Sequence, residues 1–133
     1  MEKIITTLQG RKKSVTRLTK NSKLIKAVIK AIKEKKGENI VSLDLRKIDE
    51  AVADFFIICE AQSRTQVNAI ADFIEETVQK ECDEKPYHIE RSDLWTLVDY
   101  VNLVVHIFQK EHRKFYDLES LWADAVREEH NEQ

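Results

Sequence analysis

The two apolar runs at residues 94–98 and 103–108 constrain the fold more than any other part of this sequence. Each run has the length of a β-strand, and the four residues between them begin with Asp and end with Asn. Strand-length apolar runs that flank a short segment of this kind are typical of a β-hairpin. The sequence therefore predicts two antiparallel strands that lie side by side.

Other segments show the periodicities of helices and of further strands. Apolar residues recur at helical spacing between Ser22 and Gly37 and again over residues 63–81, and a serine that can cap a helix begins each segment. Leu118, Leu121, Trp122 and Ala125 have the same spacing and predict a helix that folds back after the hairpin. Three more segments have the alternating or continuous apolar pattern of strands: 40–45, 55–59 and 87–90.

This order of elements predicts an α/β fold. Strands that are separated by a long helical crossover form a layered arrangement in which helices cover a sheet. At 133 residues the chain has the size of one domain, and we detect no internal repeat. We therefore expect a single-domain mixed β-sheet of about five strands flanked by helices.

Composition excludes several classes of protein. No apolar run is long enough to span a membrane, and there is no secretory signal pattern. The two cysteines, Cys59 and Cys82, lie far apart and outside any Cys-x-x-Cys motif, so no zinc site is predicted. A reducing interior compartment fits this cysteine usage.

The charges are distributed unevenly along the chain. Residues 1–36 hold 12 basic and 2 acidic residues, whereas the remainder holds 10 basic and 22 acidic residues. Such asymmetry predicts two surfaces with different partners, a polyanion for the first part and a basic protein for the second.

Residues 1–22 form a basic N-terminal arm without clear periodicity. Its basic side chains can contact the phosphates of RNA. A solvated tail and an organelle transit peptide are the alternatives, the second because the arm is rich in Ser and Thr and nearly free of acids. The residues predicted to contact RNA are Arg11, Lys12, Lys13 and Arg17.

No catalytic constellation can be assembled from the sequence. There is no Gly-rich phosphate loop and no Gly-x-Ser-x-Gly motif. His106 lies within an apolar strand, where a core histidine held by one hydrogen bond is favoured over a catalytic base. His88 and His106 form at most a weak metal hypothesis, and no cofactor is predicted.

A binding surface is predicted on the first strand of the hairpin. Trp95, Leu97 and Asp99 share the parity of one sheet face, and Tyr100 follows them. Aromatic residues are common interface anchors, and an acid beside them can pair with a basic partner. Arg113 and Tyr116 follow the last strand and are predicted to border the same patch. A core position for Trp95 is the alternative.

The same part of the chain carries a longer motif. A Trp precedes an apolar strand and Asp, a second strand ends in apolar-apolar-His, and an Arg-x-Phe-Tyr-x-Leu-Glu-x-Leu-Trp run follows. These residues are Trp95, Asp99, Val104, Val105, His106, Arg113, Phe115, Tyr116, Leu118, Glu119, Leu121 and Trp122. The motif resembles that of the Iojap-like ribosomal silencing factors. The resemblance covers residues 23–126, which leaves the arm and a C-terminal tail, residues 127–133.

The resemblance implies a non-enzymatic function. Members of this family bind the large ribosomal subunit through its fourteenth protein, and they sterically block joining with the small subunit. This chain is therefore expected to repress translation under nutrient limitation, to take part in large-subunit biogenesis, and to lie in the cytoplasm rather than in an organellar matrix. The family's fold resembles that of nucleotidyltransferases, without their catalytic motifs.

Two alternatives stay open, a nucleotidyltransferase-like enzyme and a homodimeric scaffold. The enzyme would need clustered acids to hold magnesium, but an arginine follows Asp44 where a second acid is required, and there is no Gly-Ser pair. The chain also departs from the family pattern at two positions. Val101 stands in the hairpin turn where Gly is usual, so Asn102 is expected to take the positive φ, and Arg91 replaces another Gly.

Overall fold

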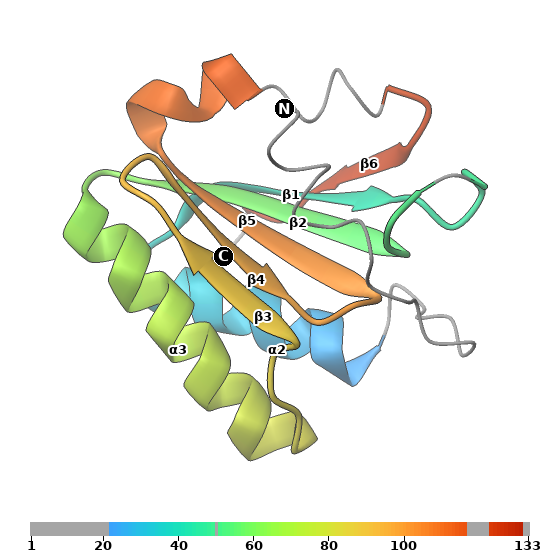
Figure 1. The fold of residues 1–133 in the computed structure, drawn as a ribbon, viewed down its shortest axis with the longest axis horizontal. Helices are drawn as coiled ribbons and strands as arrows, with labels where there is room; N and C mark the ends of the chain where they lie inside the picture. The colour runs from blue at the N-terminus through green and yellow to red at the C-terminus, as the bar shows by residue number, and fades with distance from the viewer. Residues whose placement is uncertain (1–21, 50, 117–122, 132–133) are drawn as a thin grey trace.

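The computed structural model describes residues 22–49, 51–116 and 123–131, which form a mixed α/β fold (Figure 1). The helices are α2 (Lys23–Glu34), α3 (Arg64–Cys82) and the short 3-10 helix η1 (Lys110–Tyr116). The strands are β1 (Glu38–Asp44), β2 (Phe55–Ala61), β3 (His88–Arg91), β4 (Trp95–Asp99), β5 (Leu103–Gln109) and β6 (Val126–Glu129). The predicted α/β class is confirmed.

The six strands form one sheet in the order β3-β4-β5-β2-β1-β6. Only β2 and β5 pair in parallel, because α3 carries the chain back across the sheet between them, and β4 and β5 form the predicted hairpin. The number of strands was predicted slightly too low. The additional strand, β6, lies almost entirely within the predicted C-terminal tail and pairs with β1.

The two long helices begin where the sequence predicts. The Oγ atoms of Ser22 and Ser63 accept hydrogen bonds from the N–H groups of Ile25 and Gln66, at 3.2 and 3.1 Å. These bonds satisfy amide groups that have no partner within the helix. Most of the proposed third helix, Leu118–Trp122 in the sequence, lies outside the described residues, and Ala125 comes just before β6.

Gly37 follows the end of α2, where a glycine usually adopts a left-handed conformation, but here it does not. The left-handed conformation belongs to Lys36, with φ of 65°, and the N–H of Gly37 donates to the carbonyl of Ile32 at 2.9 Å. A Cβ atom on Gly37 would lie 2.4 Å from Cγ2 of Ile32. Glycine is therefore required here by close packing.

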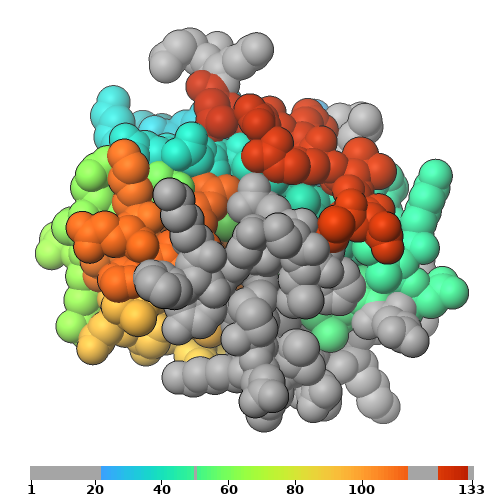
Figure 2. Space-filling view, turned by 90° about the horizontal axis from the view of Figure 1, so that it is seen from above, coloured from blue at the N-terminus to red at the C-terminus, as the bar shows by residue number. Residues whose placement is uncertain are grey.

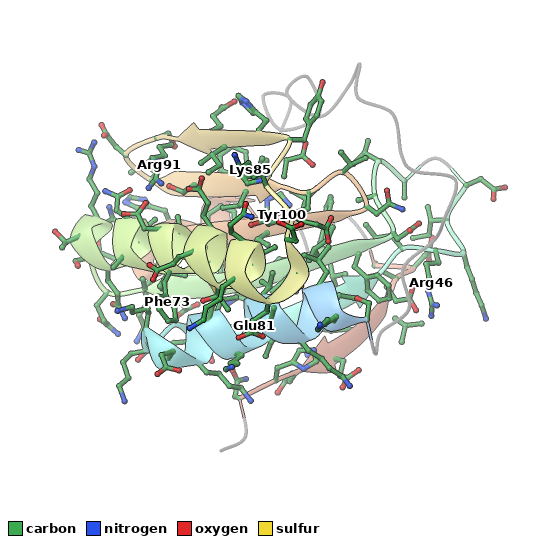
Figure 3. The ribbon with its side chains drawn as sticks, turned by 90° about the horizontal axis from the view of Figure 1, so that it is seen from below. Arg46, Phe73, Glu81, Lys85, Arg91 and Tyr100 are labelled. Carbon is green, nitrogen blue, oxygen red and sulfur yellow. The ribbon has the colours of Figure 1, made fainter. Side chains whose placement is uncertain are left out.

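Both long helices cover the same face of the sheet, which we call the helix face (Figures 1 and 3). The core beneath them is mainly aliphatic, with Val28 and Ile32 of α2 and Ile70 and Ile74 of α3 completely buried. We call the opposite side of the sheet the aromatic face, and Figure 2 is seen from that side. Its buried residues from the strands include Phe56, Ile58, Trp95, Leu97, Val104, His106 and Phe108.

Candidate functional site

The predicted binding residues of β4 share one face of the sheet, but they are not exposed. Trp95, Leu97 and Asp99 pair with Phe108, His106 and Val104 of β5, and their exposed fractions are 4%, 0% and 1%. Strand β4 lies between β3 and β5 rather than at an edge, so its side chains pack within the sheet. The expectation of an exposed patch made from these three side chains is therefore wrong.

Trp95 belongs to an aromatic cluster around His106. Nε1 of Trp95 donates a hydrogen bond to Nδ1 of His106 at 3.3 Å, and the two ring planes are within 7° of parallel. Phe56 meets His106 edge-on, with 4.6 Å between the ring centroids. Complete burial lowers the pKa of His106 to about 3. The imidazole is therefore neutral, and its Nε2 finds no hydrogen-bond partner among the described residues.

The hairpin turn after Asp99 is a tight γ-turn with an unfavourable backbone. The N–H of Asn102 donates to the carbonyl of Tyr100 at 2.9 Å, and Val101 between them has φ of 72°. This conformation is rare and is strained for a β-branched residue. The expectation that Asn102 would take the positive φ is therefore wrong.

Two carboxylates stabilise this turn. Oδ1 of Asp99 accepts a hydrogen bond from the N–H of Val101 at 2.7 Å. Nδ2 of Asn102 donates to Oδ2 of the buried Asp54 at 2.8 Å, and the carbonyl of Asn102 accepts from the N–H groups of Asp54 and Phe55. Asp99 therefore holds the backbone of the turn, and Asn102 connects the turn to the start of β2.

Tyr100 points away from Trp95, toward α3 (Figure 3). It is 7% exposed, and within the described parts of the chain its hydroxyl has no hydrogen-bond partner. Burial, with a smaller contribution from Glu75, raises the pKa of this hydroxyl well above its usual value. Tyr100 therefore belongs to the core of the helix face.

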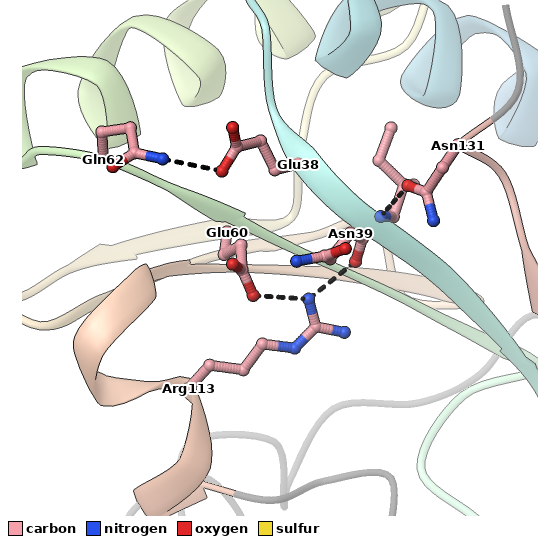
Figure 4. Close-up of polar contacts among 7 residues, drawn as sticks. Glu38, Asn39, Glu60, Gln62, Arg113 and Asn131 are labelled. Carbon is pink, nitrogen blue, oxygen red and sulfur yellow. Dashed lines mark hydrogen bonds and ion pairs between the residues drawn. The ribbon is translucent and has the colours of Figure 1, made fainter.

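Arg113 is also mostly shielded from solvent, and Figure 4 shows its guanidinium against Glu60 and Asn39. Its Nη1 donates to Oε1 of Glu60 at 3.1 Å and to the carbonyl of Asn39 at 2.7 Å. The side chains of Arg113 and Glu60 are 12% and 7% exposed, so this is a buried ion pair between η1 and β2. The side chain of Tyr116 and the arm residues Arg11, Lys12, Lys13 and Arg17 lie outside what the structure describes.

Exposed apolar side chains occur at both ends of the edge hairpin formed by β3 and β4. Tyr87 precedes β3 and is 64% exposed, and Leu94 precedes β4 and is 37% exposed. Between them, His88 and Glu90 project from β3 toward the same side as Asp99 and Leu97, their partners in β4. The surface beside the predicted patch therefore consists of the exposed Tyr87, His88 and Leu94 together with the partly buried Glu90, and we call it the edge surface.

The arrangement around Asp44 does not suit a magnesium ion. The carboxylate of Asp44 accepts two hydrogen bonds from the guanidinium of Arg46, at 2.9 and 2.7 Å. These hydrogen bonds lower the pKa of Asp44. Among the described residues there is no group of three or more His, Cys, Asp or Glu side chains that could hold a metal ion.

Comparison with known proteins agrees with the resemblance noted in the sequence. Residues 18–133 match the family model described as ribosomal silencing factor during starvation. The chain belongs to this family. It is 38% identical over 106 residues to the ribosomal silencing factor RsfS of Halalkalibacterium halodurans, covering 79% of this chain and 90% of that one. It is 37% identical over 107 residues to RsfS of Bacillus subtilis, covering 77% and 86%.

Solved structures support the assignment to the ribosomal silencing factor family. A crystal structure from Bacillus halodurans superposes with a TM-score of 0.67 at 35% identity, covering 77% of this chain and 95% of that one. A crystal structure from Chromobacterium violaceum gives a TM-score of 0.69 at 31% identity, covering 75% and 83%. More distant similarity extends to the chloroplastic Iojap protein of Zea mays and to a mouse protein named for mitochondrial assembly of the large ribosomal subunit.

One contact in this silencing-factor chain superficially resembles a hydrolase triad. Oγ of Ser42 lies 2.8 Å from Nε2 of His130, but Nδ1 of His130 is 4.0 Å from the nearest carboxylate oxygen of Glu128. That distance is too long for a hydrogen bond, and Ser42 is buried in the middle of β1. The contact instead fastens the residue after β6 to β1. Within the described part of the chain, no helix has the length and apolar character to cross a bilayer.

The sequence analysis did not predict the edge surface. It predicted a binding surface on β4, the neighbouring strand. Tyr87 and Leu94 are the first residues of the predicted strands 87–90 and 94–98, and apolar residues of a strand usually point inward. Their position could have indicated exposure, because each residue lies at the end of a loop and directly precedes a strand. Glu60 was missed as the partner of Arg113 since the two residues are 53 positions apart.

Proposed function

We propose that this chain binds the large ribosomal subunit through the subunit's fourteenth protein and blocks joining with the small subunit. The observation that carries the proposal is the family match over residues 18–133. Binding at the intersubunit face needs no bond to be made or broken, because an occupied face sterically excludes the other subunit. The expected consequence is lower translation when nutrients are scarce.

We assign the contact with the ribosomal protein to the edge surface. Tyr87 and Leu94 supply exposed apolar area, and Glu90 supplies negative charge for a basic partner. Strand β3 lies at the edge of the sheet, so the surface is accessible from outside. The buried side chains of β4 and its turn then support this surface indirectly, because they fix the positions of the strand and the turn. These residues are Trp95, Leu97, Asp99 and Tyr100.

The acidic remainder of the chain supports a basic partner as well. From residue 37 onward the chain holds 22 acidic and 10 basic residues, which favours association with a positively charged protein. The arm residues Arg11, Lys12, Lys13 and Arg17 are proposed to contact ribosomal RNA near this site. We place the protein in the cytoplasm with its ribosomes, and we include a role in large-subunit biogenesis in the proposal.

Co-sedimentation with purified ribosomal subunits tests this proposal. The full chain should travel with free large subunits and not with small subunits, and it should reduce formation of the joined ribosome. The paired substitution Tyr87→Ala with Leu94→Arg should weaken binding at least tenfold, because it removes apolar area and adds a repelling charge. Both side chains are exposed, so the variant should fold normally.

Val126→Arg provides a matched control. Val126 is 64% exposed and lies on β6, at the opposite edge of the sheet from β3. The control variant should bind subunits as the unaltered chain does. Equal loss in both variants would refute the assignment to the edge surface, and failure of the unaltered chain to bind large subunits would refute the function itself.

A further inference from the structure

Helix α2 carries a row of lysines that its packing does not explain. Its inner side is fully occupied by the apolar core of the helix face, whereas Lys23, Lys26, Lys30 and Lys33 are exposed on its outer side. Their spacing of three, four and three residues places them on one side of the helix, over a length of about 15 Å. Lys36 continues the row beyond the end of the helix.

This row opposes the stability of its own helix. Like charges three or four residues apart repel each other, and cations near the N-terminus oppose the helix dipole. The first turn contains no acid to offset Lys23 and Lys26, and Glu34 is the single acid of α2. Local rules of this kind are most often broken where a surface serves binding.

The neighbouring helix shows that the pattern is specific to α2. Helix α3 lies beside α2 on the same face of the sheet (Figure 3) but contains four acids, Asp72, Glu75, Glu76 and Glu81, against two bases. One ion pair joins the helices where Nζ of Lys30 lies 2.9 Å from Oε2 of Glu81. Lys26 and Lys36 have no ion-pair partner in the described part of the chain, so their charges are available to a ligand.

Two surface hollows extend the row into a continuous basic surface. The first, of about 510 Å³, is lined by Lys26, Ile29, Lys30, Lys33 and Glu34. The second, of about 660 Å³, shares Lys33 and adds Lys36 and Lys110, and one acid, Glu38, lines it beside Asn39 and His130. Lys110 comes from η1, so elements distant in the sequence contribute cations to the same hollow.

We propose that this surface, defined as Lys23, Lys26, Lys33, Lys36 and Lys110, binds the phosphate backbone of an RNA helix. The described residues of this surface include no exposed aromatic side chain on which unpaired bases could stack, which favours contact with phosphates over recognition of single-stranded bases. The basic arm, with Arg11, Lys12, Lys13 and Arg17, leads directly into Lys23. The proposal rests on the proposed function, under which the RNA belongs to the large ribosomal subunit.

Fluorescence anisotropy with a labelled synthetic RNA duplex tests the proposal in the full chain. The unaltered chain should bind with an affinity that falls steeply with salt. Lys26→Glu with Lys33→Glu should lower affinity at least tenfold and should reduce the slope of log affinity against log salt by about two, one for each lost phosphate contact. Circular dichroism should show the helix content unchanged.

The matched control is Lys80→Glu with Lys85→Glu, which changes net charge equally on exposed lysines outside this surface. It should leave the salt slope unchanged. If both variants lose affinity equally, or if the unaltered chain binds anionic lipid vesicles but not the duplex, the proposal is overturned. If the unaltered chain also fails to bind large subunits, the proposed function fails separately, because that assay does not use the duplex.

Discussion

Both faces of the sheet are buried, but the side chains that they bury differ in polarity. On the helix face, α2 and α3 cover aliphatic side chains such as Ile57, Val105 and Ile107, and burial requires few polar partners. The aromatic face buries His106, Trp95 and the Glu60–Arg113 ion pair, and the polar contacts of these side chains come from other strands and from η1. Stability on the aromatic face should therefore depend more strongly on single side chains and on pH.

The largest difference between the faces is expected at the buried ion pair. Arg113→Ala should lower the free energy of unfolding by about 3–5 kcal/mol, because it leaves the carboxylate of Glu60 buried without its cation. Urea denaturation measures this change. Replacing both partners, with Arg113→Met and Glu60→Leu, should recover most of the loss, since no charge then remains buried. A double variant as unstable as the single one would contradict this account.

An intermediate effect is expected from His106 in acid. Its pKa is lowered to about 3 in the folded protein, below the value of about 6.5 in an unfolded chain. Between these values the unfolded state binds a proton that the folded state does not. This residue alone should therefore lower the free energy of unfolding by about 1.4 kcal/mol for each pH unit below 6.5. Above pH 6.5 the imidazole is neutral in both states, so this loss of stability is absent.

Urea denaturation from pH 7 to pH 4 isolates this contribution. The slope of stability against pH should become shallower in His106→Phe by about the amount stated above, whatever the substitution does to stability at pH 7. The same substitution at the half-exposed His88 serves as the control. An unchanged slope in His106→Phe would show that the imidazole is not held neutral by the aromatic face.

The smallest effect is expected on the helix face, at Tyr100. No residue that the structure describes forms a hydrogen bond with its buried hydroxyl, so Tyr100→Phe removes a polar group without leaving another described one unpaired. The free energy of unfolding should change by less than about 1 kcal/mol or should rise. A loss of more than about 2 kcal/mol in thermal or urea unfolding would mean that this face, too, depends on a buried polar contact.

The contrast between the faces also explains what the sequence could predict. The two long helices, five strands and the hairpin follow from local periodicity and caps, and the family motif points to the correct family. Strand β6 has no apolar alternation and is exposed along its length, so local pattern carries no signal for it. The burial of Trp95 and Arg113 depends on side chains contributed by distant segments. Sequence reasoning could identify these residues as important, but it could not separate a buried support from an exposed contact.

The pairing of β1 with β6 has a consequence during synthesis. Strand β1 is complete at residue 44, but its outer neighbour is formed by residues 126–129, which are synthesised about 80 residues later. Until those residues leave the ribosome, one side of β1 presents unpaired backbone groups, as an open sheet edge does. Neighbouring nascent chains on a crowded polysome can pair with that edge, so the yield of soluble protein should depend on how quickly β6 is synthesised.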